Sequence, residues 1–283
     1  MMRGCWLIAV AVLAACSRKP QAEGVFLDPA LATLIPADTT VMVGTRIDLL
    51  AKTQIFQERL AKLQAVQEFE RRTNVNPRKD LWQLLFISNG RKGFLLGRGK
   101  FADELMAPDL SRQGVQRFSY KGLILFGDER EALLFINSST AAVGETAVLR
   151  SLVDQRPTIT GPPARVVKLM KEIPREAQFW GVYAGGPVDL PLSGNMANVN
   201  KMLGMVESGD FYFDLSKRVT GLATASSAGA QQLQDALNGL IGLVKMATPK
   251  SQALFEGIRV SSENRRVNVT VDAPPEVPEL FLK

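Results

Sequence analysis

Two of the residue types that most often do chemistry in proteins are absent or rare in this chain: histidine occurs at none of the 283 positions, and cysteine at two. Histidine is the commonest metal ligand, and its unperturbed pKa lies nearest neutrality. Its absence excludes a Ser-His-Asp triad, a Cys-His dyad and any zinc site built on histidine. Hydrolysis by paired carboxylates or by a Ser-Lys pair remains open, although no spacing in the sequence points to either.

Asp210 and Asp214 form the acidic pair with the most suggestive spacing. They flank a predicted strand four residues apart, and residues at even spacing along a strand point to the same face. A shared metal ion or an acid–base pair is one interpretation. Solvent-facing strand ends are the interpretation that we favour, because no third ligand accompanies the two carboxylates.

Two further patterns are similar to binding motifs without matching them. The glycine-rich stretch 90–100 departs from the P-loop pattern G-x-x-x-x-G-K-[ST], because its glycine spacing differs and Phe101 follows Lys100. Hairpin glycines explain this stretch. Met196, Met202 and Met205 are more typical of core or interface packing than of a soft-metal site. We therefore predict no catalytic, cofactor-binding or metal-binding residues.

The first 16 residues have the pattern of an export signal. Arg3 supplies a positive charge, residues 6–13 form a short apolar run, and small residues lead to Cys16. Eight apolar residues are too few to span a bilayer, which needs about 20. A charged start, a short apolar run and a small-residue cleavage site indicate a secretory signal peptide.

Leu13-Ala14-Ala15-Cys16 resembles the bacterial lipobox. The resemblance implies that residues 1–15 are removed, that the Cys16 thiol receives a diacylglycerol, and that residues 16–33 hold the lipid and a tether. Cys5 would leave with the signal, so the mature chain would have neither a free thiol nor a disulfide. An ordinary signal peptide with a chance cysteine is the alternative. Ser17 implies sorting to the outer membrane if the host is Gram-negative.

The formal net charge is +6, and the basic residues are interspersed with acidic ones. Nucleic acid is an unexpected partner for an exported protein. Anionic lipid head groups or envelope polysaccharides fit the charge better. The interpretation that we favour is a solvated surface that keeps the protein soluble.

The order of the predicted elements occurs twice, at an offset of roughly 130–138 residues along the chain. We predict a first repeat at 34–137, a helical connector at 138–172, a second repeat at 173–273 and a proline-rich tail at 274–283. Each repeat is predicted to run β-α-β-β-α-β-β. The expected fold class is α+β, with largely antiparallel sheets and helices packed on one face. Whether the repeats form one sheet or two remains open.

Apolar periodicity and turn residues place the individual elements. Helices are expected at 48–72, 102–110, 144–155, 164–172, 194–207 and 229–247. Strands are expected at 40–45, 81–87, 93–99, 122–126, 132–136, 178–183, 210–215, 220–225, 257–261 and 266–271. Most of these strands come in pairs joined by turn residues, such as Asn89-Gly90, so hairpins should dominate.

The layout also resembles the duplicated, envelope-associated domains of unknown function found in bacterial lipoproteins. The likeness is carried by Ile35-Pro36 and Ile173-Pro174, which open the two repeats, and by residues 142–153, which are similar to the connecting helix of those families. The resemblance implies no activity, because none is established for the type.

Three functions follow as hypotheses. The first is a non-enzymatic envelope lipoprotein, anchored to the membrane lipid through acylated Cys16, that binds or scaffolds another envelope protein. The second is a binder of lipid or another hydrophobic ligand, using an apolar groove near Trp180, Tyr183, Phe211, Tyr212 and Phe213. The third and least favoured is a carboxylate or Ser-Lys hydrolase. The expected location is the cell envelope, on the periplasmic face of the outer membrane if the host is Gram-negative.

Overall fold

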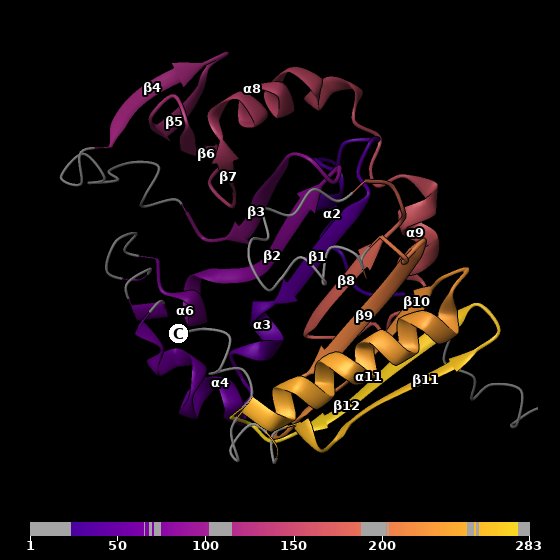
Figure 1. Ribbon diagram of the computed structural model, residues 1–283. Helices are drawn as coiled ribbons and strands as arrows, with labels where there is room; N and C mark the ends of the chain where they lie inside the picture. Colours follow the sequence, from indigo (N-terminus) through magenta and orange to yellow (C-terminus); the bar gives the residue numbers. More distant parts are fainter. Residues whose placement is uncertain are drawn as a thin grey trace, which may run out of the picture.

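A single antiparallel sheet of twelve strands organises the molecule (Figure 1). The computed structural model describes residues 24–101 (except 65, 68, 69 and 71–74), 115–187, 202, 204–247, 252 and 255–276. Across the sheet the strand order is β11-β12-β10-β9-β8-β1-β2-β3-β7-β6-β5-β4. Strands from the two halves of the chain meet near the centre of the sheet, where β1 pairs with β8.

The strands of the first half are β1 (Val41–Arg46), β2 (Leu81–Ser88), β3 (Gly93–Gly99), β4 (Gln116–Tyr120), β5 (Leu123–Gly127), β6 (Glu131–Asn137) and β7 (Thr140–Glu145). Those of the second half are β8 (Phe179–Tyr183), β9 (Ser208–Asp214), β10 (Val219–Ser226), β11 (Ile258–Glu263) and β12 (Arg266–Ala273). The hairpins predicted at 81–99 and 122–136 are confirmed.

The predicted α+β class, with two β-α-β-β-α-β-β units and helices packed on one face, is wrong. The strands form one large antiparallel sheet. Among the described residues the protein consists mostly of strands and has few helices. The prediction failed because a strand pattern shows which residues extend but not which strands become neighbours. Here the pairing of β1 with β8 joins both halves into one sheet.

The two halves of the sheet follow the same order of pairing outward from the centre. On one side β1 is followed by β2, β3, β7 and β6, and on the other β8 is followed by β9, β10, β12 and β11. In both series the last two strands are reversed relative to the chain. Strands β5 and β4 extend the first half beyond this common pattern.

The helix expected at 48–72 is instead a series of short turns. The structure has α3 (Ile47–Leu50), α4 (Gln54–Glu58) and the 3₁₀ turn η1 (Leu60–Lys62). Thr53 separates the first two, because its extended backbone lets its hydroxyl accept a hydrogen bond from the amide of Phe56 at 3.2 Å. Asp48, in the first turn of α3, forms an ion pair with Arg46 at 2.6 Å.

The other helices cover parts of the sheet. They are α2 (Pro29–Ala32), α6 (Pro77–Asp80), α8 (Thr146–Gln155), η3 (Arg156–Thr158), α9 (Ala164–Met170) and α11 (Ala230–Ala247). Strands β4 and β7 were not predicted, and β7 lies in the segment expected to be a helical connector. The helix predicted at 102–110 lies outside the described residues, as does most of the one at 194–207.

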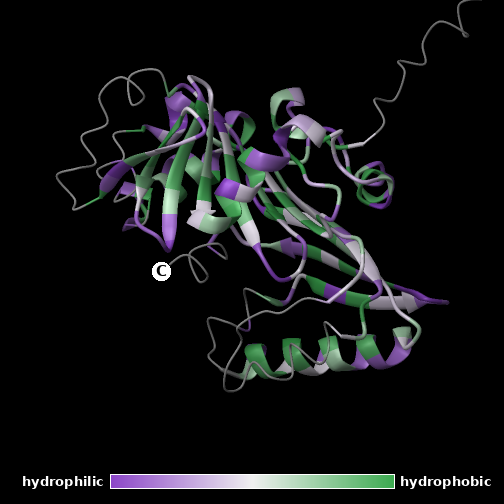
Figure 2. Ribbon diagram, turned by 90° about the horizontal axis from the view of Figure 1, so that it is seen from above, coloured by the Kyte–Doolittle hydropathy of each residue, from purple (hydrophilic) through white to green (hydrophobic). Residues whose placement is uncertain are grey.

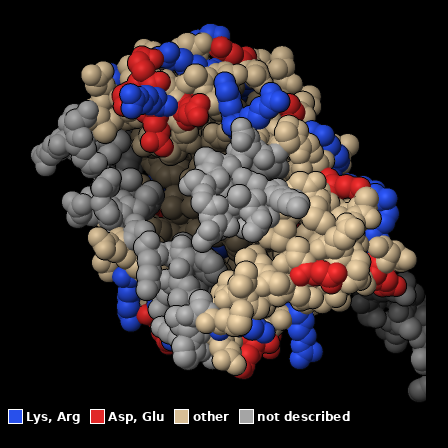
Figure 3. All heavy atoms as spheres, viewed as in Figure 1, with Lys and Arg blue, Asp and Glu red and all other residues tan. Residues whose placement is uncertain are grey.

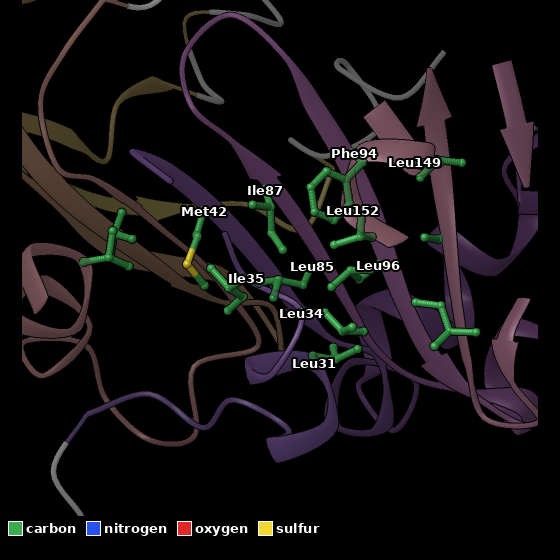
Figure 4. Close-up of a cluster of buried hydrophobic side chains, with 14 of the residues drawn as sticks. Leu31, Leu34, Ile35, Met42, Leu85, Ile87, Phe94, Leu96, Leu149 and Leu152 are labelled. Carbon is green, nitrogen blue, oxygen red and sulfur yellow. The ribbon is translucent and has the colours of Figure 1, made fainter. Parts of the chain in front are cut away.

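The main core lies on one face of the central strands (Figure 4). Met42, Leu85 and Leu96 on the sheet are fully buried against Leu31 of α2 and Leu149 of α8. On the opposite face, α11 packs against β11 and β12 at the end of the sheet (Figures 1 and 2). The two faces of the sheet are therefore covered by different helices.

Candidate functional site: the open apolar face of the sheet

One row of directly paired residues crosses the whole sheet on the face opposite the main core. Residues that lie directly opposite each other in antiparallel strands point to the same face. From β11 to β4 the row consists of Val260, Val269, Ala223, Phe211, Gly181, Val43, Phe86, Leu95, Val143, Leu133, Phe126 and Arg117. Every member except the edge residue Arg117 is apolar or glycine. We call this set the apolar row.

The middle of the apolar row is open to solvent. Phe86 is 40% exposed and Val143 37% exposed, whereas Leu85 and Ala142, their neighbours in the chain, are fully buried on the other face. The space-filling view shows this face hollowed at its centre, with a group of charged side chains above the hollow (Figure 3). Isolated exposed apolar residues are ordinary, but a contiguous patch marks an interaction surface.

Three phenylalanine rings cluster on β8 and β9: Phe211 of the apolar row and its neighbours Phe179 and Phe213 on the same face. The ring centroids of Phe179, Phe211 and Phe213 lie 5.5–6.3 Å apart. Glycines on the adjacent strands make room for them, since a Cβ atom at Gly181 would lie 2.4 Å from the Phe211 ring and one at Gly221 would lie 2.5 Å from the Phe213 ring. The Phe211 ring therefore lies against Gly181, and the Phe213 ring lies against Gly221.

The aromatic residues that were expected to line one groove are divided between the two faces. Phe211 belongs to the apolar row, and Tyr183 is paired with Val41 on the same face. Trp180 pairs with Tyr212 on the opposite face, and its side chain is fully buried in the core. The alternation of side chains along a strand separates neighbours in sequence in this way.

Helix α11 adds exposed apolar surface at the end of the same face. Its Leu233 packs against Val267 of β12. Leu240, Leu243 and Met246, toward the C-terminal end of the helix, stay exposed. Among the described residues, no helix is both long enough and apolar enough to cross a membrane.

The acidic pair Asp210 and Asp214 does not form a joint site. Four residues along a strand span about 13 Å, too far for one ion. Asp214 accepts hydrogen bonds from the Gln178 amide at 3.4 Å and from the backbone of Ser216 at 2.8 Å. Burial raises the pKa of Asp210 to about 6, while the positive charge of Arg266 opposes that rise. Within the ranges that the structure describes, no group of acidic residues and cysteines is arranged to hold a metal ion.

Serine, lysine and aspartate do meet at one small hollow, of about 140 Å³, between the β2–β3 turn and α8. Their hydrogen bonds serve the fold: the Ser88 hydroxyl donates to the Lys92 carbonyl at 2.8 Å, and Asp38 accepts from the Asn89 amide at 2.9 Å. The Ser151 hydroxyl accepts from a glutamine of its own helix. This arrangement gives no support to Ser-Lys chemistry.

The other sequence candidates occupy structural positions or lie outside the described residues. The glycine-rich stretch 90–100 forms the β2–β3 turn and β3, and Gly90 has a φ of +90° that favours glycine. Met202 and Met205 pack beside α11. Met196 and Cys16 lie outside the described part of the chain.

Sequence analysis missed the apolar row, although a signal for it was present. Residues 84–87, 94–96, 123–126 and 132–136 are continuous apolar runs rather than alternating ones. Such runs are typical of strands with two apolar faces. They indicate that a second face needs a cover or a ligand, but only the strand order shows that these residues form one surface.

Comparison with known proteins supports the fold alone. Neither a protein-family model nor a curated protein matches the sequence. Three solved crystal forms of a protein named TP0453 are similar in structure. Form III has a TM-score of 0.52 at 11% identity over 89% of this chain and 96% of that chain. Form I has 0.51 at 10% identity over 90% and 97%, and form IV has 0.50 at 11% identity over 91% and 98%. The chain therefore shares the large-sheet architecture of TP0453.

Proposed function

We propose that this chain is a lipid-anchored, non-enzymatic binding protein of the bacterial cell envelope, and that its open sheet face binds an apolar ligand. The observation that carries the proposal is the apolar row, whose central members Phe86 and Val143 remain exposed. The occupant that we propose is the acyl chain of a lipid. The lipobox at Cys16 would hold the protein beside a membrane, where acyl chains are the most abundant apolar molecules.

The chemistry of the surface suits an acyl chain. Binding an apolar ligand contributes about 25 cal/mol for each Å² of apolar surface removed from water. The row offers Val43, Phe86, Leu95 and Val143 on four adjacent strands. The side chains at these four positions cannot form hydrogen bonds, so they cannot hold a polar substrate in a defined orientation. This favours binding over catalysis.

The test uses a Cys16→Ser variant, so that no anchor lipid is confused with a ligand. A fluorescent fatty acid is titrated into this protein, and bound lipids are extracted and identified by mass spectrometry. We expect saturable binding, and at least a tenfold loss of affinity when Val143→Asp places a charge in the row. The matched control is Ser261→Asp, which adds the same charge to an exposed strand position on the opposite face.

Two results would contradict the proposal. One is the absence of fatty-acid binding by the folded protein. The other is equal affinity of the two aspartate variants, which would place the ligand away from the apolar row. If a protein fragment from the envelope co-purifies in place of lipid and is lost in Val143→Asp, the row is a scaffold surface and the acyl-chain assignment is wrong.

A further inference from the structure

The segment that follows the proposed tether is fastened to one end of the sheet. The amide of Val25 donates to the carbonyl of Met170, the last residue of α9, at 3.0 Å. The Gln83 side chain on β2 accepts from the amide of Asp28 at 2.9 Å and donates to the carbonyl of Phe26 at 3.3 Å. The point at which the tether leaves the body is therefore fixed by hydrogen bonds.

Arginines and aromatic rings surround this exit point. The guanidinium groups of Arg46 and Arg175 lie 4.5 and 5.5 Å from the centre of the Phe26 ring. Arg98 forms an ion pair with Asp28 at 3.2 Å, and its guanidinium lies 5.2 Å from the centre of the Trp82 ring. We call Phe26, Arg46, Trp82, Arg98 and Arg175 the exit surface.

Trp82 is the unusual member of the exit surface, because 41% of it is exposed. The strand pairing is irregular between Leu81 and Gln83, so Trp82 escapes the regular alternation of β2. The other large apolar residues exposed in the described ranges lie elsewhere: Phe86 and Val143 are in the apolar row, and three more are on α11. Trp82 therefore needs an explanation of its own.

The tether is short enough to keep the exit surface near a bilayer. Eight peptide units separate Cys16 from Gly24, and a fully extended chain of that length reaches at most about 29 Å. Tryptophan is enriched at the boundary between lipid and water, where its apolar ring and its N–H group are both satisfied. Arg46 and Arg98 are ion-paired with Asp48 and Asp28, whereas Arg175 is exposed, and its guanidinium group suits a phosphate of the same layer.

We propose that the exit surface rests on the head-group layer of the bilayer, with Trp82 at the boundary between head groups and acyl chains. The proposal depends on the anchoring through Cys16 proposed above. It gives the anchored protein a preferred orientation, in which the start of β2 and the end of β3 face the membrane.

The tryptophans of the chain make a direct test possible. Trp6 lies in the signal sequence, and Trp180 is fully buried, which leaves Trp82 as the tryptophan that lipid can reach. The acylated mature protein, which begins at Cys16 and lacks Trp6, is reconstituted into vesicles of phosphatidylcholine and phosphatidylglycerol. Part of the lipid carries bromine, either near the glycerol end or near the methyl end of the acyl chains, because bromine quenches tryptophan fluorescence at short range.

We expect bromine near the glycerol end to remove at least a third of the emission and to quench more than bromine near the methyl end. In Trp82→Phe, which keeps an aromatic ring, the remaining emission of Trp180 should be unaffected by either lipid. Vesicle flotation is measured on the same samples, and circular dichroism verifies that the variant is folded.

The outcomes separate the two proposals. Protein that floats with the vesicles but is not quenched keeps the anchor and overturns the exit surface, as does stronger quenching by the deeper bromine. Protein that does not float contradicts the anchor itself, and the exit-surface proposal fails with it. If iodide in water cannot reach Trp82 in native envelope membranes but reaches it in pure lipid vesicles, the surface faces a protein and the membrane assignment is wrong.

Discussion

The indole ring of Trp180 lies directly over Gly44, the residue paired with it across the seam between β1 and β8. A Cβ atom at Gly44 would lie 2.3 Å from Cε2 of that ring and 2.5 Å from its nitrogen. Trp180 is fully buried at this position. The absence of a side chain at Gly44 is therefore what allows the largest side chain of the core to cross the centre of the sheet.

Gly44→Ala should destabilise the protein by about 1–3 kcal/mol, because the added methyl group overpacks a site that the indole ring already fills. Urea denaturation followed by circular dichroism measures the change. Gly239→Ala is the matched control, since a Cβ atom there meets nothing within 4 Å and alanine is favoured over glycine inside a helix by about 1 kcal/mol. Equal effects of the two variants would refute the packing argument.

Asp210→Asn should stabilise the protein at neutral pH more than at acidic pH. Burial raises the pKa of Asp210 to about 6 from an ordinary 3.8. The folded state thus holds the proton more tightly than the unfolded state, so the contribution of this group is fully present below pH 4 and is lost as the pH rises through 6. Asparagine does not titrate and avoids that loss. Urea midpoints of both proteins from pH 4 to 8 provide the measurement, and a difference that does not vary with pH would argue against it.

Cys16→Ala should abolish incorporation of labelled palmitate and release the protein from the membrane fraction as a soluble or uncleaved form. The physical reason is that each buried methylene contributes about 0.8 kcal/mol to membrane binding. Fractionation followed by immunoblotting measures the change. Cys5→Ser is the control and should have no effect on the mature protein. Full membrane retention of the alanine variant would rule out lipidation at this residue.

Thr53→Ala should cost about 1 kcal/mol, because it removes the side chain that caps α4. Thr53 is buried, and its hydroxyl accepts from the Phe56 amide and donates to the Leu50 carbonyl at 2.8 Å. Thr53→Ser keeps the hydroxyl and should lose much less. The two variants are compared by thermal denaturation, and the cap has no role if they lose the same stability.

Local patterns predicted many strands and turns correctly, because apolar runs between glycine, asparagine and aspartate leave few other structures open. The turn at Asn89-Gly90 is an example. They failed where one side-chain hydrogen bond decides the outcome, as at Thr53, which ends a helix that the apolar spacing would continue. They also failed at β7, where the sequence Thr-Ala-Ala-Val-Gly-Glu carries little strand preference and tertiary pairing with β3 and β6 decides.

The candidate site was less predictable than the strands for a related reason. Phe86 and Val143 are 57 positions apart in the chain. They become members of one row because each pairs with Leu95, which is known only once the strand order is known. Their apolar character could be read from the sequence, and their common surface could not. An export signal is a local pattern that a sequence can display, whereas the contact of Asp28 with Gln83 and Arg98 depends on the folded sheet.

The seam between β1 and β8 also has a consequence for symmetry. Strands that open the two halves lie side by side and antiparallel, as a two-fold axis would place the same strand in two identical subunits. Either half alone would present a bare hydrogen-bonding edge at its first strand. We expect a polypeptide cut between residues 156 and 163 to behave as two complementary halves that reassociate, and the first half by itself to form a homodimer through β1.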